Sequence, residues 1–299
     1  MGTTVRVVLY AASADRAEAG RKAAFAVMKQ VDDLMSDYKP DSELSRLSRA
    51  AGKGPQPVSP PLFDVLEASL RTAQLSEGTF DVTIGPLIRL WRRSRKELKL
   101  PSPEDVRAAK ALVDHRRLVL DPARRTAELK QEGMILDLGG IAKGYACDRA
   151  LAALKDLGIA RAMVDTGGGM ALGDPPPEKP GWRIGMLGDA SRVLVLRNCG
   201  VSTSGDVEQF VEIEGRRYSH IIDPATGLGL TNQAMATVIA PTGLLSDALD
   251  TPICILGPER GLRMSAAQGG VEAWTQWIEN RRRRRAETPG FKNFAVAAD

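Results

Sequence analysis

The chain has 299 residues, of which 43% are hydrophobic and 26% are charged, so it has enough apolar material for a core and is not wholly disordered. No apolar run reaches the roughly 18 residues of a membrane-spanning helix, and no charged leader precedes an apolar stretch. The net charge of +4 depends in part on one basic block at 281–285, which predicts a solvated surface or a local phosphate or partner patch rather than a nucleic-acid interface.

The N-terminal part of the chain predicts one strand followed by helices. Residues 4–10 alternate as a strand does, and apolar residues recur at helical spacing over 14–36. Ser42 follows a Pro-Asp turn and is expected to cap a short helix. Two further helices are expected over 60–77 and 103–112.

The C-terminal part predicts mostly strands. A hairpin of 118–120 with 127–129 and a helix over 141–157 come first. The strands expected after them are 163–166, 182–187, 192–197, 201–205, 209–215, 218–222, 236–240 and 271–277. Helices are expected near 244–257 and 258–268. This order of elements is typical of an α+β fold with mainly antiparallel sheets.

The three cysteines are far apart in the chain. Cys147, Cys199 and Cys254 form no CxxC pair and have no histidine at a zinc-ligand spacing, and three thiols cannot make a disulfide framework. Cys147 and Cys254 lie in apolar settings, which predicts core positions.

Two glycine-rich turns are candidate sites. DLGGIAKGYACDRA at 137–150 is expected to turn into a helix whose N-terminus, with Lys143 in its first turn, would attract a phosphate; an ordinary turn with a surface lysine is the alternative. VDTGGGM at 164–170 indicates either a close backbone approach to a ligand or a sharp turn.

A histidine and a carboxylate group are further candidates. His220 is expected in a strand, as a proton acceptor or as a structurally bonded residue, whereas His115 is expected at the surface. In SDALDT at 246–251, Asp247 and Thr251 share a helix face with Asp250 nearby, which suits either Mg²⁺ or helix capping.

The segment TFDVTIGPLIRLW at 79–91 predicts a turn, a short strand and an apolar helix anchored in the core by Trp91. Thr79, Phe80 and Asp81 stand at its entrance, where they could line a pocket.

Taken together, these segments resemble the ApbE family of FAD:protein FMN transferases. The resemblance covers nearly the whole chain, because the family motifs occur in family order. They are MGT at 1–3, MSDYKPDSELSRL at 35–47, FDVTIGPLIRLW at 80–91, LDLGGIAKGYACD at 136–148, the TGGG loop, VSTSGD at 201–206, YSHIIDPATG at 218–227 and SDALDT at 246–251.

The resemblance implies a T-fold-like α+β architecture, one bilobal domain over 1–299 and an FAD cleft between two lobes. It implies Mg²⁺-dependent transfer of FMN from FAD onto a threonine hydroxyl of an acceptor flavoprotein, with release of AMP. The residues that it places against FAD are Met1, Tyr38, Thr79, Phe80, Asp81, Asp137, Lys143 and Ile222. Those that it places at the metal are Asp247, Asp250, Thr251 and, through its carbonyl, Gly140.

Two positions depart from many relatives. Gly140 stands where some members supply a threonine hydroxyl, and Ser48 stands where many carry asparagine near the flavin pocket. The second departure keeps open an FAD pyrophosphatase, which would use water as the nucleophile. An FAD-binding protein without transfer activity is the other alternative.

The implied reaction agrees with the residues present. A weakly acidic hydroxyl that attacks a pyrophosphate needs a base, for which His220 is the candidate, while Mg²⁺ and Lys143 offset phosphate charge. The resemblance further implies work outside the cytoplasm, periplasmic or membrane-anchored, on a subunit of a membrane electron-transfer system. The match of Met1 to an internal family methionine leads us to expect an exported precursor that has lost its leader.

Overall fold

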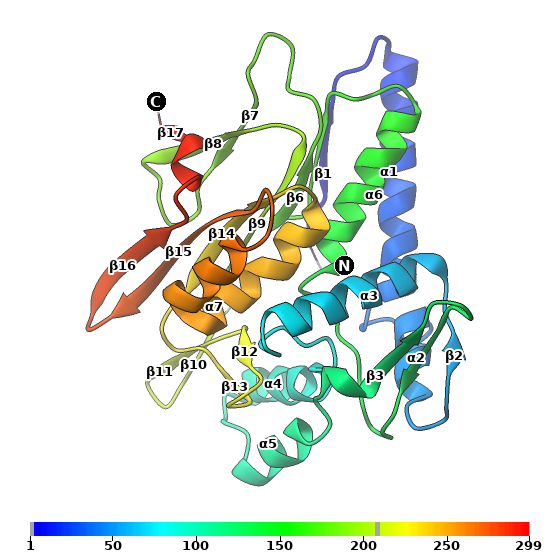
Figure 1. Ribbon diagram of the computed structural model, residues 1–299, viewed down its shortest axis with the longest axis vertical. Coiled ribbons are helices and arrows are strands. Elements are labelled where there is room, and N and C mark those ends of the chain that lie inside the picture. The colour runs from blue at the N-terminus through cyan, green and yellow to red at the C-terminus, as the bar shows by residue number, and fades with distance from the viewer. Residues whose placement is uncertain (1–2, 207–209, 299) are drawn as a thin grey trace. The chain divides into compact units, whose positions relative to one another are not determined.

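The computed structural model describes residues 3–206 and 210–298, and these divide into two compact units (Figure 1). The first unit comprises Met1–Gln30, Ile141–Ser204 and Met235–Asp299, and the second comprises Val31–Gly140 and Gly205–Ala234. Each unit is therefore assembled from segments far apart in the sequence. The single bilobal domain and its FAD cleft stay predictions.

A seven-stranded sheet forms the centre of the first unit. Its order is β1 (Arg6–Leu9), β5 (Ala162–Asp165), β6 (Gly169–Leu172), β9 (Cys199–Gly205), β14 (Met235–Ala240), β15 (Glu272–Glu279) and β16 (Arg282–Glu287). Strands β1 to β9 pair antiparallel in that order, and so do β14, β15 and β16. A small sheet of β7 (Trp182–Gly185), β8 (Arg192–Leu196) and β17 (Ala295–Ala297) completes the unit.

Helices cover this large sheet. Helices α6 (Ala142–Asp156) and α7 (Gly243–Ala266) pack against each other and against its central strands, and α1 (Ala14–Met35) begins in the same unit (Figure 1). Helix α7 bends at Gly257, whose φ of 77° is non-helical, and Pro258 follows it. This bend separates the two helices that the sequence predicts. Trp274 and Phe291 are the largest fully buried side chains of the core beneath the small sheet.

The second unit contains most of the short helices. They are α2 (Glu43–Arg49), α3 (Pro60–Leu75), α4 (Gly85–Glu97) and α5 (Pro103–Lys110). Its strands are β2 (Gln56–Pro57), β3 (Leu118–Asp121), β4 (Thr126–Leu129), β10 (Phe210–Ile213), β11 (Arg216–Ser219), β12 (Ile222–Asp223) and β13 (Leu228–Gly229). Trp91 anchors the α4 face as predicted: it is 3% exposed and its indole N–H donates to the Gly227 carbonyl at 2.8 Å.

Local signals place most of these elements correctly. Ser42 caps α2 by accepting from the Ser45 N–H at 3.0 Å, and α3, α4, α5 and the 118–129 hairpin occur where they are predicted. The mainly antiparallel α+β fold is confirmed, and Cys147 and Cys254 are buried as expected. No helix among the described residues is both long and apolar enough to cross a membrane.

Two local predictions are wrong. Residues 81–84 form no strand, and only an isolated bridge joins Ile84 to Ile135. His220 lies in a bend after β11, not within a strand. The glycine run at 167–169 makes the turn from β5 into β6, one of its two predicted roles, and the basic block is exposed and lies largely on edge strand β16, in agreement with the predicted solvated surface. Exposed charge on an edge strand discourages pairing with other chains.

Candidate functional site

Two buried carboxylates lie side by side on α7 in the first unit. Asp247 and Asp250 are 2% and 3% exposed. The Ser202 hydroxyl donates to Asp250 Oδ2 at 2.6 Å, and the Thr251 hydroxyl donates to Asp250 Oδ1 at 3.2 Å. Lys143 Nζ lies 3.2 Å from Asp247 Oδ1. Three of the four predicted metal ligands are therefore gathered on one helix, with Lys143 beside them.

The N-termini of α6 and α7 hold this group in place. Asp247 on α7 accepts from the Gly144 N–H of α6 at 2.9 Å. Asp148 on α6 accepts from the Gly243 and Leu244 N–H groups of α7 at 2.7 and 2.8 Å. Each helix thus supplies a carboxylate to the unpaired N–H groups and positive dipole end of the other. Asp247 is not a cap of its own helix, which begins at Gly243 after the N-cap Thr242.

Close approach of the two helices requires glycine. A Cβ atom built on Gly144 would lie 2.0 Å from the Gly243 carbonyl oxygen, which is well inside van der Waals contact. Gly144 therefore has a packing role in addition to any contact of the 137–150 motif with phosphate. Since Asp247 already accepts from Gly144, that N–H is not open to a ligand in this arrangement.

The electrostatics of the pair suit a divalent cation. Burial, and then the nearby Asp247 carboxylate, raise the pKa of Asp250 to about 8. A cation between the two groups would offset both effects. Within the described part of the chain, no cluster of three or more His, Cys, Asp or Glu side chains is placed to bind a metal. Two carboxylates with hydroxyl, carbonyl and phosphate oxygens suit Mg²⁺, which rarely uses an all-protein cage.

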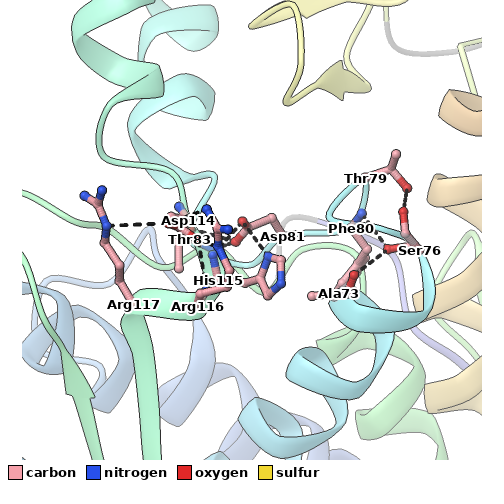
Figure 2. A network of polar contacts seen from close by, with 10 residues as sticks. All are labelled: Ala73, Ser76, Thr79, Phe80, Asp81, Thr83, Asp114, His115, Arg116 and Arg117. Atoms are coloured by element: carbon pink, nitrogen blue, oxygen red, sulfur yellow. Dashed lines mark hydrogen bonds and ion pairs between the residues drawn. The ribbon is translucent and has the colours of Figure 1, made fainter.

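In the second unit, Asp81 is the centre of a buried polar network (Figure 2). Its Oδ1 accepts from the N–H and the hydroxyl of Thr83 at 2.8 and 2.7 Å. Its Oδ2 accepts from the His115 N–H at 2.8 Å and lies 3.5 Å from His115 Nδ1. The Asp81 carboxylate thus joins its own loop to the segment that contains His115.

His115 corrects one sequence expectation. It is not a surface residue, since its side chain is 19% exposed and packs between Asp81 and Gly78. The hydrogen bond with Asp81 raises the pKa of His115 above its usual value, although burial opposes this. Beside it, Ser76 holds the start of the loop, because its hydroxyl accepts from the Phe80 N–H at 3.0 Å and its carbonyl accepts from the Thr79 hydroxyl at 2.9 Å (Figure 2).

Arg92 organises a second group that the sequence did not reveal. Its guanidinium group pairs with Asp37, lies 3.2 Å from Asp137 Oδ2 and stands over the Tyr38 ring at 4.2 Å from the centroid. Tyr38 and Asp137 are predicted FAD contacts, and Tyr38 is 71% exposed. Arginine can bridge two carboxylates while stacking on an aromatic face. Because α4 carries several arginines, the sequence did not indicate that Arg92 has a different role from the others.

The remaining predicted residues lie between β11 and β12, His220 in the bend and Ile222 in β12. His220 is half-buried, and Ile222 is buried in the core cluster that contains Trp91. Ser219 and Asp223, expected to orient the histidine ring, accept from the backbone N–H groups of Ile221 and Ala225 at 3.0 and 2.8 Å. Their side chains therefore shape the turns on either side of His220.

Three further positions complete the set. The Ser48 hydroxyl accepts from the Leu136 N–H at 3.0 Å, so this departure from many relatives supports the segment that leads to Asp137. Gly140 belongs to the second unit, and its carbonyl stays a predicted ligand. Met1 lies outside the described residues.

Comparison with known proteins gives one consistent result. The family model described as the ApbE family matches residues 1–275. An FAD:protein FMN transferase of Klebsiella pneumoniae is 32% identical over 315 aligned positions, which cover 99% of this chain and 87% of the relative. One from Treponema pallidum is 32% identical, with 91% of this chain and 81% of the relative covered.

Solved structures give the same result. The flavin transferase ApbE from Vibrio cholerae, solved as a histidine-to-glycine mutant, superposes with a TM-score of 0.88 at 28% identity and covers 98% of this chain and 96% of its own. The ApbE protein of Thermotoga maritima superposes with a TM-score of 0.87 at 26% identity over the same shares. These matches confirm the predicted ApbE-type fold.

Proposed function

The chain belongs to the ApbE family, and on that premise we propose that it is an enzyme that transfers FMN from FAD to an acceptor flavoprotein. The observation that carries the proposal is the group on α7, where two buried carboxylates, a hydroxyl and Lys143 converge. A protein that only binds FAD has no need of buried like charges, which cost stability unless a cation offsets them.

The proposed reaction is attack by a threonine hydroxyl of the acceptor on the FMN-side phosphorus of FAD. A new phosphoester bond forms at that phosphorus, the pyrophosphate P–O bond breaks, and AMP leaves with the bridging oxygen. The hydroxyl proton passes to a base, for which we propose His220. Lys143 is placed to offset charge on the phosphate oxygens.

We propose that Asp247, Asp250, Thr251 and the Gly140 carbonyl hold Mg²⁺. When bound, the ion supplies Lewis-acid stabilisation of the phosphate oxygens. The arrangement supports this proposal, because Gly144 and Ser202 each hold one carboxylate oxygen. The opposite oxygens face Lys143, in the case of Asp247, and the Thr251 hydroxyl, itself a proposed ligand, in the case of Asp250. Tyr38, Thr79, Phe80, Asp81, Asp137 and Ile222 are proposed to contact FAD.

A mass measurement on the acceptor tests this function. Incubation with FAD, Mg²⁺ and a candidate acceptor domain should raise the intact mass of the acceptor by one FMN group and release one AMP. Asp247→Asn should abolish the transfer, while Asp156→Asn, a carboxylate at the other end of α6, should leave it unchanged. Release of AMP without the mass increase would instead identify an FAD pyrophosphatase.

The same assay tests His220 as the base. His220→Ala should lower kcat by about 10²–10⁴-fold and remove the loss of activity at acidic pH, with little change in FAD affinity. If His220→Ala weakens FAD binding and keeps kcat at saturation, the base is another group, and Asp250 is the alternative.

The acceptor is proposed to be a subunit of a membrane electron-transfer system, and the place of action is proposed to be the periplasm or the outer side of a membrane. Both proposals rest on the resemblance to the family, whose members usually act outside the cytoplasm on such subunits. Fractionation of the native host with an antibody against the chain tests the second.

A further inference from the structure

An open groove lies at the C-terminal end of α4 in the second unit. Its volume is about 410 Å³, within the usual range of ligand pockets. It is lined by Arg92, Arg95, Lys96, Leu98, Phe210 and Val211. The lining thus combines cationic side chains of α4 with apolar side chains at 98, 210 and 211.

The charge on this wall is only partly neutralised. Arg92 is committed to Asp37 and Asp137. No ion pair or hydrogen bond to another described residue engages the side chains of Arg95 and Lys96, and both are exposed. Arg217 stands over the Phe210 ring at 3.5 Å and adds a fourth cation at the edge, although it is paired with Asp206.

Helix stability explains part of this pattern but not all of it. Cations in the last turn of a helix favour its negative end, which accounts for basic residues at 95 and 96. This effect on helix stability does not account for the exposed apolar side chains beside Arg95 and Lys96. Leu98 is 65% exposed and Phe210 is 37% exposed. Exposed apolar and aromatic groups next to arginine are typical of protein interfaces.

We propose that this groove docks an acidic segment of the acceptor protein, with an apolar side chain on Phe210 and carboxylates opposite Arg95 and Lys96. The proposal rests on the proposed function, because it presumes a protein acceptor. Arg92 links the groove to that function, since the same guanidinium group holds Tyr38 and Asp137, the predicted flavin contacts. An acceptor segment docked here would therefore lie beside groups that position the flavin.

A binding measurement tests the groove without any transfer reaction. The probe is a short fluorescent peptide with glutamates on both sides of one leucine, and its matched control carries glutamine for each glutamate. Anisotropy should show binding of the acidic peptide and not of the control. Binding should weaken strongly as ionic strength rises from about 0.01 M to about 1 M, where the Debye length falls from about 30 Å to about 3 Å.

Two charge-reversal variants identify the surface. Arg95→Glu/Lys96→Glu should weaken peptide binding by about 10-fold or more, because like charges then face the glutamates. Arg282→Glu/Arg283→Glu makes the same change in net charge on exposed strand β16 of the first unit and should leave the affinity within about twofold. FAD affinity should be unchanged in both variants.

Two outcomes would overturn the proposal. Equal losses in both variants would mean that the peptide responds only to net charge. Displacement of the peptide by FAD or ADP would identify a nucleotide site instead.

If transfer to a real acceptor is observed and the peptide result holds, Arg95→Glu/Lys96→Glu should raise the acceptor KM and leave kcat unchanged. If no transfer occurs, the peptide measurement still decides whether the groove binds acidic segments.

Discussion

Arg92 joins three segments of the second unit. It joins α4 to Asp37 and Tyr38, which follow α1, and to Asp137 in the segment before α6. A lysine would keep the charge but cannot hold two carboxylates and stack on a ring in the same way. Arg92 is therefore a positioning residue for two predicted FAD contacts.

Arg92→Lys should weaken FAD binding by about 10-fold, which corresponds to about 1.4 kcal/mol, because Tyr38 and Asp137 lose their common partner. Titration of flavin fluorescence measures the affinity. Arg93→Lys is the matched control, since Arg93 is exposed and pairs with the exposed Asp105 at 3.2 Å. Equal affinities for both variants would contradict the assigned role.

His115 makes the stability of the second unit depend on pH. Its pKa is raised in the folded protein by the hydrogen bond with Asp81. A raised folded pKa means that the protonated histidine stabilises the fold at pH values below the unfolded pKa of about 6.5. That contribution is lost as pH rises through the folded pKa.

We expect the unfolding free energy of the wild type to exceed that of His115→Gln by about 1 kcal/mol at acidic pH, because glutamine keeps a neutral hydrogen bond but not a charge-assisted one. The difference should shrink as pH rises above the histidine range. Urea unfolding at several pH values measures it. A difference that is constant with pH would show that His115 is not protonated beside Asp81.

At the scale of elements, α6 and α7 are joined by reciprocal carboxylate caps. Asp148 binds the first N–H groups of α7, and Asp247 binds an N–H group of α6. Burial raises the pKa of Asp148, although the two backbone hydrogen bonds oppose this. The caps fix where Asp247 and Asp250 lie along α7 relative to Lys143.

Asp148→Ala should lower the unfolding free energy by about 0.5–2 kcal/mol, the usual effect of losing an N-cap, and should weaken Mg²⁺ binding in the presence of FAD. Thr242→Ala is the control, because Thr242 caps the same helix from its own side chain by accepting from the Leu245 N–H at 3.2 Å, whereas Asp148 caps it from α6. It should lower stability similarly and leave Mg²⁺ affinity unchanged. Calorimetric titration separates the two, and equal Mg²⁺ affinities would rule out a positioning role for Asp148.

At the scale of the whole molecule, ligand binding should raise stability by mass action. FAD with Mg²⁺ at about 100 times the dissociation constant should stabilise the protein by about 2.7 kcal/mol and raise its Tm by several degrees. The part of the rise that requires Mg²⁺ should disappear in Asp247→Asn and persist in Asp156→Asn. A Tm that does not respond to Mg²⁺ in the wild type would show that the α7 carboxylates do not bind it.

Most elements of this fold follow from local chemistry and were predictable. The Ser42 cap, the helical spacing in α1 and the 118–129 hairpin need only neighbouring residues, and the structure has them where the sequence predicts them. That Asp247 and Thr251 lie together on α7 was equally predictable, because residues four apart on a helix share a face. The family resemblance was also predictable from the sequence, because its motifs are short local segments that occur in family order.

Other features depend on contacts between distant segments. Three contacts each join residues at least 34 positions apart. They are the hydrogen bond between Asp81 and His115, the one between Asp247 and the Gly144 N–H, and the contacts of Arg92 with Asp37 and Asp137. The basic block became edge strand β16 because β15 supplies its hydrogen-bond partners. The sequence by itself determined most of the elements and the family to which the chain belongs. Only the tertiary structure decided which charged side chains pair. The reason is that packing brings particular partners within hydrogen-bond distance, and those partners are far apart in the sequence.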